Sequence, residues 1–195
     1  MLLVRAGPVA NPGVLYSHPG FPLSEEGRSR LAALLPWLRE AEIEAVYAPD
    51  SLAEEEAGEL FAKGLRVPLE LFPELRERSW GDWEGHSFEE VRRRWPELVH
   101  AWAEDEAGFA PPGGESVRDV YARSQPVLKR LLERHAGGAF LVVSTCVTSR
   151  AALSLALPFL PPEEGLRLEQ DYAGLSELRF YGEDGVLAYT NRHPA

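Results

Sequence analysis

The chain has 195 residues, of which 45% are hydrophobic and 26% are charged. These are ordinary values for a globular protein with a sizeable core. The length fits one α/β domain over residues 1–195. The formal net charge of −11 argues against nucleic acids and anionic membranes as partners, because both attract Lys and Arg.

Several features favour a cytoplasmic location. No segment is apolar over the length that spans a bilayer, and the first residues lack the basic start of a signal peptide. Cys146 is the single cysteine, so no internal disulfide can form. Amides are scarce and Lys occurs only at Lys63 and Lys129. This composition is typical of a thermophilic source, and GC-rich codon use explains it nearly as well.

The first half of the chain alternates between strands and helices. Strands are predicted over residues 1–4, 45–48 and 67–72. Ser24 is expected to cap a helix with one apolar face, kinked at Pro36, and Ser51 with Glu54 forms a candidate capping box for a second helix. Residues 5–23 form a long loop rich in Gly and Pro, of the kind that is often functional.

The second half continues the same pattern. Ser87 and Glu90 predict a capped helix that stops near Pro96, and Ser116 caps a long amphipathic helix that ends at the Gly137–Gly138 pair. Residues 139–144 are the clearest buried strand, followed by a helix that ends at Pro158. Residues 176–181 and 186–190 flank a Gly-bounded turn, which indicates a β-hairpin.

This alternation predicts an α/β fold. We expect a three-layer α/β/α sandwich with a mainly parallel central sheet and helices on both faces. Ligands bind beyond the carboxyl ends of the strands in such sheets. Four segments are therefore candidates for a site: residues 5–11, 48–53, 76–85 and 144–150.

These segments resemble the histidine phosphatase superfamily, in its phosphoglycerate-mutase-like branch. The resemblance covers nearly the whole chain and is carried, in order, by LVRAGPVAN, PLSEEGRSRL, AVYAPD, LRERSWGDWEG, GESVRDVYAR and FLVVSTCVTSR. It implies the same three-layer fold. It also implies chemistry in which a neutral imidazole attacks phosphorus, arginines and a second histidine hold the phosphoryl oxygens, and a carboxylic acid protonates the leaving group.

The sequence departs from that pattern where the chemistry resides. The family's Arg-His-Gly motif is here Arg5-Ala6-Gly7, so the nucleophile maps to Ala6. The second arginine maps to Ala53, the second histidine to Thr145, and the acid to Glu77. No catalytic set is intact, and Glu77 is a vestigial acid or a hydrogen-bonding loop residue. The predicted ligand-binding residues are Arg5, Asn11, Glu77 and Ser144.

Other readings of single residues stay open at this point. Arg5 either pairs with a carboxylate such as Glu77 or still binds an anionic ligand, and the first interpretation is slightly favoured. His18 could replace the nucleophile, although an exposed histidine is the simpler interpretation. Cys146 and Arg150 are too close in sequence to form a cysteine phosphatase loop, and Trp80 and Trp83 are expected to anchor their loop. The other histidines show no metal-ligand spacing: His86, His100, His135 and His193.

We therefore interpret the chain as a catalytically inactive pseudoenzyme with a degenerate phosphate pocket, which binds a small molecule or a protein partner. No cofactor and no metal are expected. The first alternative is an active phosphomonoesterase with a relocated nucleophile, either His18 or a bound water. The second is a structural subunit that contributes only an interface, to a partner or to a second copy of itself.

Overall fold

A computed structural model describes residues 1–11, 13–182 and 184–194. Its six strands form one sheet in the order β3-β2-β4-β1-β5-β6. The neighbours from β3 to β1 pair in parallel, whereas β5 and β6 are added antiparallel. The strands are β1 (Leu2–Arg5), β2 (Ile43–Ala48), β3 (Leu69–Leu71), β4 (Ala139–Ser144), β5 (Leu175–Tyr181) and β6 (Asp184–Arg192).

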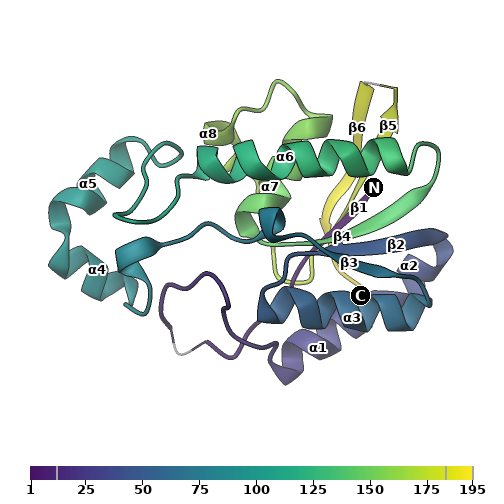
Figure 1. Cartoon of the computed structure of the whole chain (residues 1–195), viewed down its shortest axis with the longest axis horizontal. Helices are drawn as coiled ribbons and strands as arrows, with labels where there is room; N and C mark the ends of the chain where they lie inside the picture. The colour runs from purple at the N-terminus through teal and green to yellow at the C-terminus, as the bar shows by residue number, and fades with distance from the viewer. Residues whose placement is uncertain (12, 183, 195) are drawn as a thin grey trace.

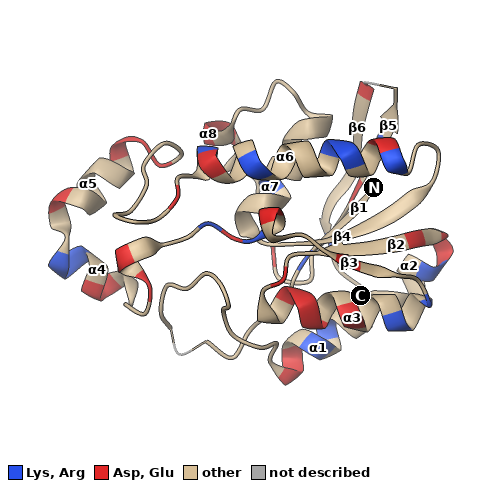
Figure 2. Ribbon diagram, viewed as in Figure 1, with Lys and Arg blue, Asp and Glu red and all other residues tan. Residues whose placement is uncertain are grey.

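Helices cover both faces of this sheet, which confirms the predicted α/β fold (Figure 1). One face carries α1 (Glu25–Ala32), α2 (Leu35–Glu40) and α3 (Leu52–Leu65), and the other carries α6 (Val117–Arg134) and α7 (Cys146–Ala156). Alternation along β1 divides the core, because Leu2 and Val4 pack in the first layer and Leu3 in the second. Charged residues of both signs lie mostly on the surrounding helices and loops (Figure 2).

Three further helices of the described chain lie outside the two covering layers: α4 (Phe88–Arg94), α5 (Pro96–Glu104) and α8 (Pro162–Gly165). The pair α4 and α5 projects from the carboxyl side of the sheet (Figure 1). The sequence predicts that a helix stops near Pro96, and α4 does end just before it. Pro96 also begins α5, since a proline in the first turn loses no helical hydrogen bond. None of the described helices combines the length and hydropathy of a membrane span.

Most predicted helix starts are confirmed. The Ser24 hydroxyl accepts a hydrogen bond from the backbone N–H of Gly27, and Ser87 and Ser116 form complete capping boxes. The box predicted for Ser51 is wrong, because the Ser51 side chain caps nothing and Glu54 lines a pocket instead.

The predicted kink at Pro36 is a full break. The chain leaves α1 after Ala32 and starts α2 at Leu35, with Pro36 in the first turn of the new helix. The hairpin predicted at the carboxyl-terminal end is confirmed by β5 and β6.

Candidate functional site

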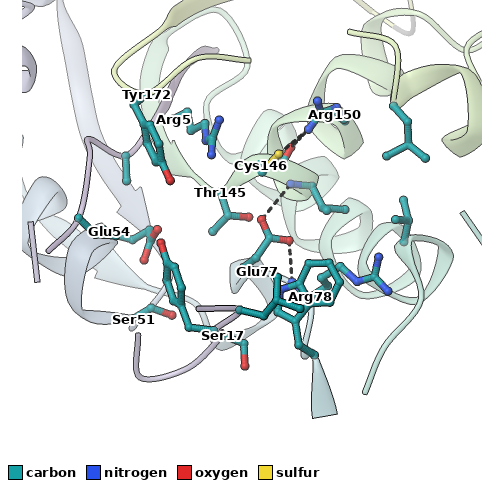
Figure 3. A pocket seen from close by; sticks show the side chains of 18 of the residues that line it. Arg5, Ser17, Ser51, Glu54, Glu77, Arg78, Thr145, Cys146, Arg150 and Tyr172 are labelled. Atoms are coloured by element: carbon teal, nitrogen blue, oxygen red, sulfur yellow. Dashed lines mark hydrogen bonds between the residues drawn. The ribbon is translucent and has the colours of Figure 1, made fainter. Parts of the chain in front are cut away.

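A pocket of about 430 Å³ opens beyond the carboxyl ends of the parallel strands. Ala6 directly follows β1 and Thr145 directly follows β4. The backbone N–H of Ala6 donates to the carbonyl of Ser144 at 3.0 Å, so the two strand ends are held side by side. Glu77, from the loop after β3, lines the same pocket (Figure 3). The structure thus brings Arg5, Ala6, Glu77 and Thr145 together, as the sequence pattern predicts.

Three predicted residues do not line this pocket. Asn11 folds back on its own loop, where its side-chain oxygen accepts from the N–H groups of Gly13 and Val14. The buried Ser144 hydroxyl bonds to the Val4 carbonyl and to Ser149, so it ties β4 to β1 and α7. Ala53 packs into the hydrophobic core, because the turn of α3 that faces the pocket presents Glu54.

His18 is also separate from this pocket. It is exposed and borders a neighbouring cavity that also contains Glu84 and Arg123. Trp83 is fully buried, as expected for a loop anchor, whereas Trp80 lines the pocket. Within the described ranges, no cluster of His, Cys, Asp and Glu side chains is arranged to hold a metal ion.

Glu77 is fixed by two backbone donors. Its Oε1 accepts from the N–H of Arg78 at 2.8 Å, and its Oε2 accepts from the N–H of Val147 at 3.1 Å. Val147 lies in the first turn of α7, whose N-cap is Thr145. The carboxylate of Glu77 therefore occupies the positive end of this helix, a position that also suits an anionic ligand.

Arg5 does not form the ion pair with Glu77 that the sequence favours. Its Nη1 donates to the backbone carbonyl of Gln170 at 2.5 Å. Its guanidinium carbon also lies 4.0 Å from the centroid of the Tyr172 ring. Arg5 is therefore held at the pocket wall by a neutral carbonyl and a cation–π contact, neither of which supplies a negative charge.

Two further arginines line the pocket and were not among the predicted site residues. Arg150 donates through Nη1 to the Cys146 carbonyl at 2.9 Å and to its Sγ at 2.6 Å. Arg78 is only 3% exposed and lies over the Trp80 ring. Burial lowers the pKa of Arg78 despite the nearby Glu77. Arg78 could have been predicted as a site residue from the sequence, since it directly follows Glu77 in the same short loop.

Glu54 introduces a second carboxyl group into the pocket (Figure 3). Burial first, and the charge of Glu77 second, raise the pKa of Glu54 to about 7, although its own backbone N–H and Arg5 act in the opposite direction. Tyr16 also lines the pocket, and its pKa is raised by burial and by its neighbours Tyr172 and Glu54. A carboxyl group with this pKa changes its charge near neutral pH.

The described lining of the pocket therefore contains charges of both signs and no imidazole. Its described lining includes three arginines and three glutamates, and no ion pair of the described chain involves any of them. These residues are Arg5, Arg78, Arg150, Glu54, Glu77 and Glu106. Such a lining can bind and orient a polar ligand, and its carboxyl groups can exchange protons with it.

Comparison of the sequence with known proteins identifies the family that it resembles. The model of the histidine phosphatase superfamily (branch 1) matches residues 1–193. The bifunctional protein Rv2228c of Mycobacterium tuberculosis is 33% identical over 172 residues, which cover 86% of this chain and 46% of that protein. The chain thus spans slightly less than half the length of that relative. The adenosylcobalamin/alpha-ribazole phosphatase of Salmonella typhimurium is 29% identical over 77% of this chain and 80% of its own.

Solved structures show the same fold. YhfR of Bacillus stearothermophilus superposes with a TM-score of 0.87 at 25% identity, over 96% of this chain and 94% of its own. A mycobacterial glucosyl-3-phosphoglycerate phosphatase superposes with a TM-score of 0.86 at 24% identity, over 98% of both chains. At these coverages the similarity extends over nearly the whole of this chain.

Proposed function

The chain belongs to the histidine phosphatase superfamily, and we propose that it is a ligand-binding member that does not catalyse transfer through a phosphohistidine. One observation carries the proposal: no histidine occurs among the described residues that line the pocket. The sequence resemblance aligns the family's nucleophile with Ala6, which does line it. A methyl group cannot attack phosphorus. Thr145, with which the resemblance aligns the second histidine, accepts a hydrogen bond from the N–H of Thr148 as a helix cap.

The charges around the pocket support a ligand that carries both signs. Unpaired, partly buried charges are costly, and a dipolar ligand compensates arginines and carboxylates together. Inorganic phosphate would meet Arg5 but also the carboxyl groups of Glu54 and Glu77. A zwitterion such as O-phosphoethanolamine is therefore expected to raise the melting temperature more than equal concentrations of phosphate or ethylamine.

A second candidate function has an observation in its favour. Glu77, Arg5 and Arg150 still surround the pocket, and the Salmonella relative is named as a phosphatase. Water could then attack a bound phosphomonoester directly, with Glu77 or Glu54 as proton donor to the leaving group. This route needs no covalent intermediate, but it lacks the attacking imidazole on which the family's rate depends.

Phosphatase assays separate the two functions. The unmodified protein and an Ala6→His/Thr145→His variant are incubated with p-nitrophenyl phosphate and with alpha-ribazole phosphate, and acid-quenched samples are tested for phosphoenzyme. Ala53 is left unchanged, because an arginine at this core position would disturb folding. We expect no turnover by the unmodified protein above a buffer blank. Turnover at rates typical of enzymes, lost in Glu77→Gln, would establish the second function instead.

A further inference from the structure

The two most exposed large apolar side chains in the described part of the chain flank one groove. Phe159 is 79% exposed and lies between Pro158 and Leu160, which both line the groove. Tyr181 is 67% exposed and lies between Phe180 and Gly182, which both line the same groove. Large aromatic side chains at this level of exposure, gathered around one concave surface, are typical of a protein interface.

The groove is distinct from the pocket at the strand ends. It has a volume of about 750 Å³ and lies between α6, the carboxyl-terminal end of α7, the proline-rich segment before α8, and the end of β5. Its walls include Leu132, Leu155 and Phe180. The groove thus offers an apolar space large enough for an aromatic side chain from another molecule.

We propose that a second copy of this chain occupies the groove in a twofold symmetric dimer. The groove lies on the same patch of the surface as the aromatic side chains that would fill the groove of a second copy. In a twofold interface, Phe159 of each copy enters the groove of the other, and both contacts form at once. A surface that carries both a protrusion and its receptacle needs no other partner to be covered.

The charges at the rim of the groove fit the same arrangement. Lys129 and Glu133 both lie on α6, both are exposed, and neither forms an ion pair within the described chain. In the twofold dimer each copy presents its lysine to the glutamate of the other. This local balance matters because two chains of net charge −11 repel one another elsewhere on their surfaces.

Sedimentation velocity over a wide range of protein concentrations tests the dimer. We expect concentration-dependent dimerisation that strengthens between 50 mM and 500 mM NaCl, since salt screens the net repulsion. Phe159→Ser is expected to raise the dissociation constant by at least about tenfold. Phe88→Ser, at an exposed aromatic position on α4, serves as the control and should leave the constant unchanged.

A charge exchange tests the symmetry of the interface. Lys129→Glu and Glu133→Lys should each weaken dimerisation when alone. Mixing the two variants places opposite charges at both contacts, so the mixture should form heterodimers more tightly than either variant forms homodimers. A protein that remains monomeric at all concentrations, or a dimer that is insensitive to Phe159→Ser and to both charge variants, would overturn the proposal.

Discussion

The carboxylate of Glu77 accepts a hydrogen bond from the backbone N–H of Val147, 70 positions later in the chain. The contact joins the loop after β3 to the first turn of α7. It also places a fixed negative charge where the amino-terminal end of a helix would otherwise attract an anion. Part of the pocket's capacity for an anion is therefore already used by the protein itself.

Glu77→Gln tests the strength of this contact. The amide has one acceptor oxygen in place of two, so one backbone N–H loses its partner and the other bond loses the strengthening charge. The free energy of unfolding should therefore fall by about 1–2 kcal/mol. Urea denaturation measures the change. Glu74→Gln, at an exposed position in the same segment, is the control and should change stability by less than about 0.5 kcal/mol. Equal effects from the two variants would show that the Glu77 contacts contribute little.

Much of the fold could be predicted from the sequence, because its local signals agree with the tertiary structure. The serine caps at Ser24, Ser87 and Ser116 mark three helix starts correctly. The apolar run over residues 139–144 gives β4 at its full length. Pro36 and Pro96 were misjudged in detail, since a proline that interrupts one helix can equally begin the next.

The site was less predictable, because side-chain direction is decided by packing. The sequence places Ala53 and Glu54 next to each other, but only the fold shows that α3 turns Ala53 into the core and Glu54 toward the pocket. Likewise, Arg5 could not be assigned its contact with Tyr172, which lies 167 positions away and follows α8. The predicted strand ends were sufficient to identify the edge of the sheet, but not the contents of the pocket.

Gly81, in the loop of residues 76–85, allows this loop to pack closely against the segment before α6. Its φ is +52°, and an added Cβ would lie 2.2 Å from the Pro112 carbonyl. Gly81→Ala should therefore lower the free energy of unfolding by about 2–4 kcal/mol. Gly85 is a matched control, because its φ is also positive at +78° but nothing lies within 4 Å of an added Cβ. Gly85→Ala should cost only about 1 kcal/mol, and a similar loss in both variants would exclude the steric explanation.

The half-buried carboxyl group of Glu54 should make stability depend on pH. Its pKa is about 7 in the folded chain against an ordinary value of 4.5, so folding favours its protonated form. This contribution is fully present below about pH 4.5 and is lost as the pH rises to about 7. From pH 5 to pH 8, the unmodified protein should lose about 1–3 kcal/mol relative to Glu54→Gln. Parallel urea titrations measure the difference, and identical pH profiles would contradict a raised pKa.

The same group should control the binding of anions to the pocket. Sulfate is the appropriate probe, because it stays a dianion from pH 5.5 to pH 8.5, whereas phosphate changes its own charge in this range. Glu54 is mostly neutral at the lower pH and ionised at the higher pH, where it repels the bound dianion. We expect sulfate to bind about tenfold more weakly at pH 8.5 than at pH 5.5 in calorimetric titrations. Glu54→Gln should abolish most of this dependence. Arg5→Gln should weaken binding at both pH values, because the arginine keeps its charge throughout, and should move the midpoint of the pH dependence upward, because Arg5 lowers the pKa of Glu54. If Glu54→Gln retained the full tenfold ratio, another group would have to carry the titration.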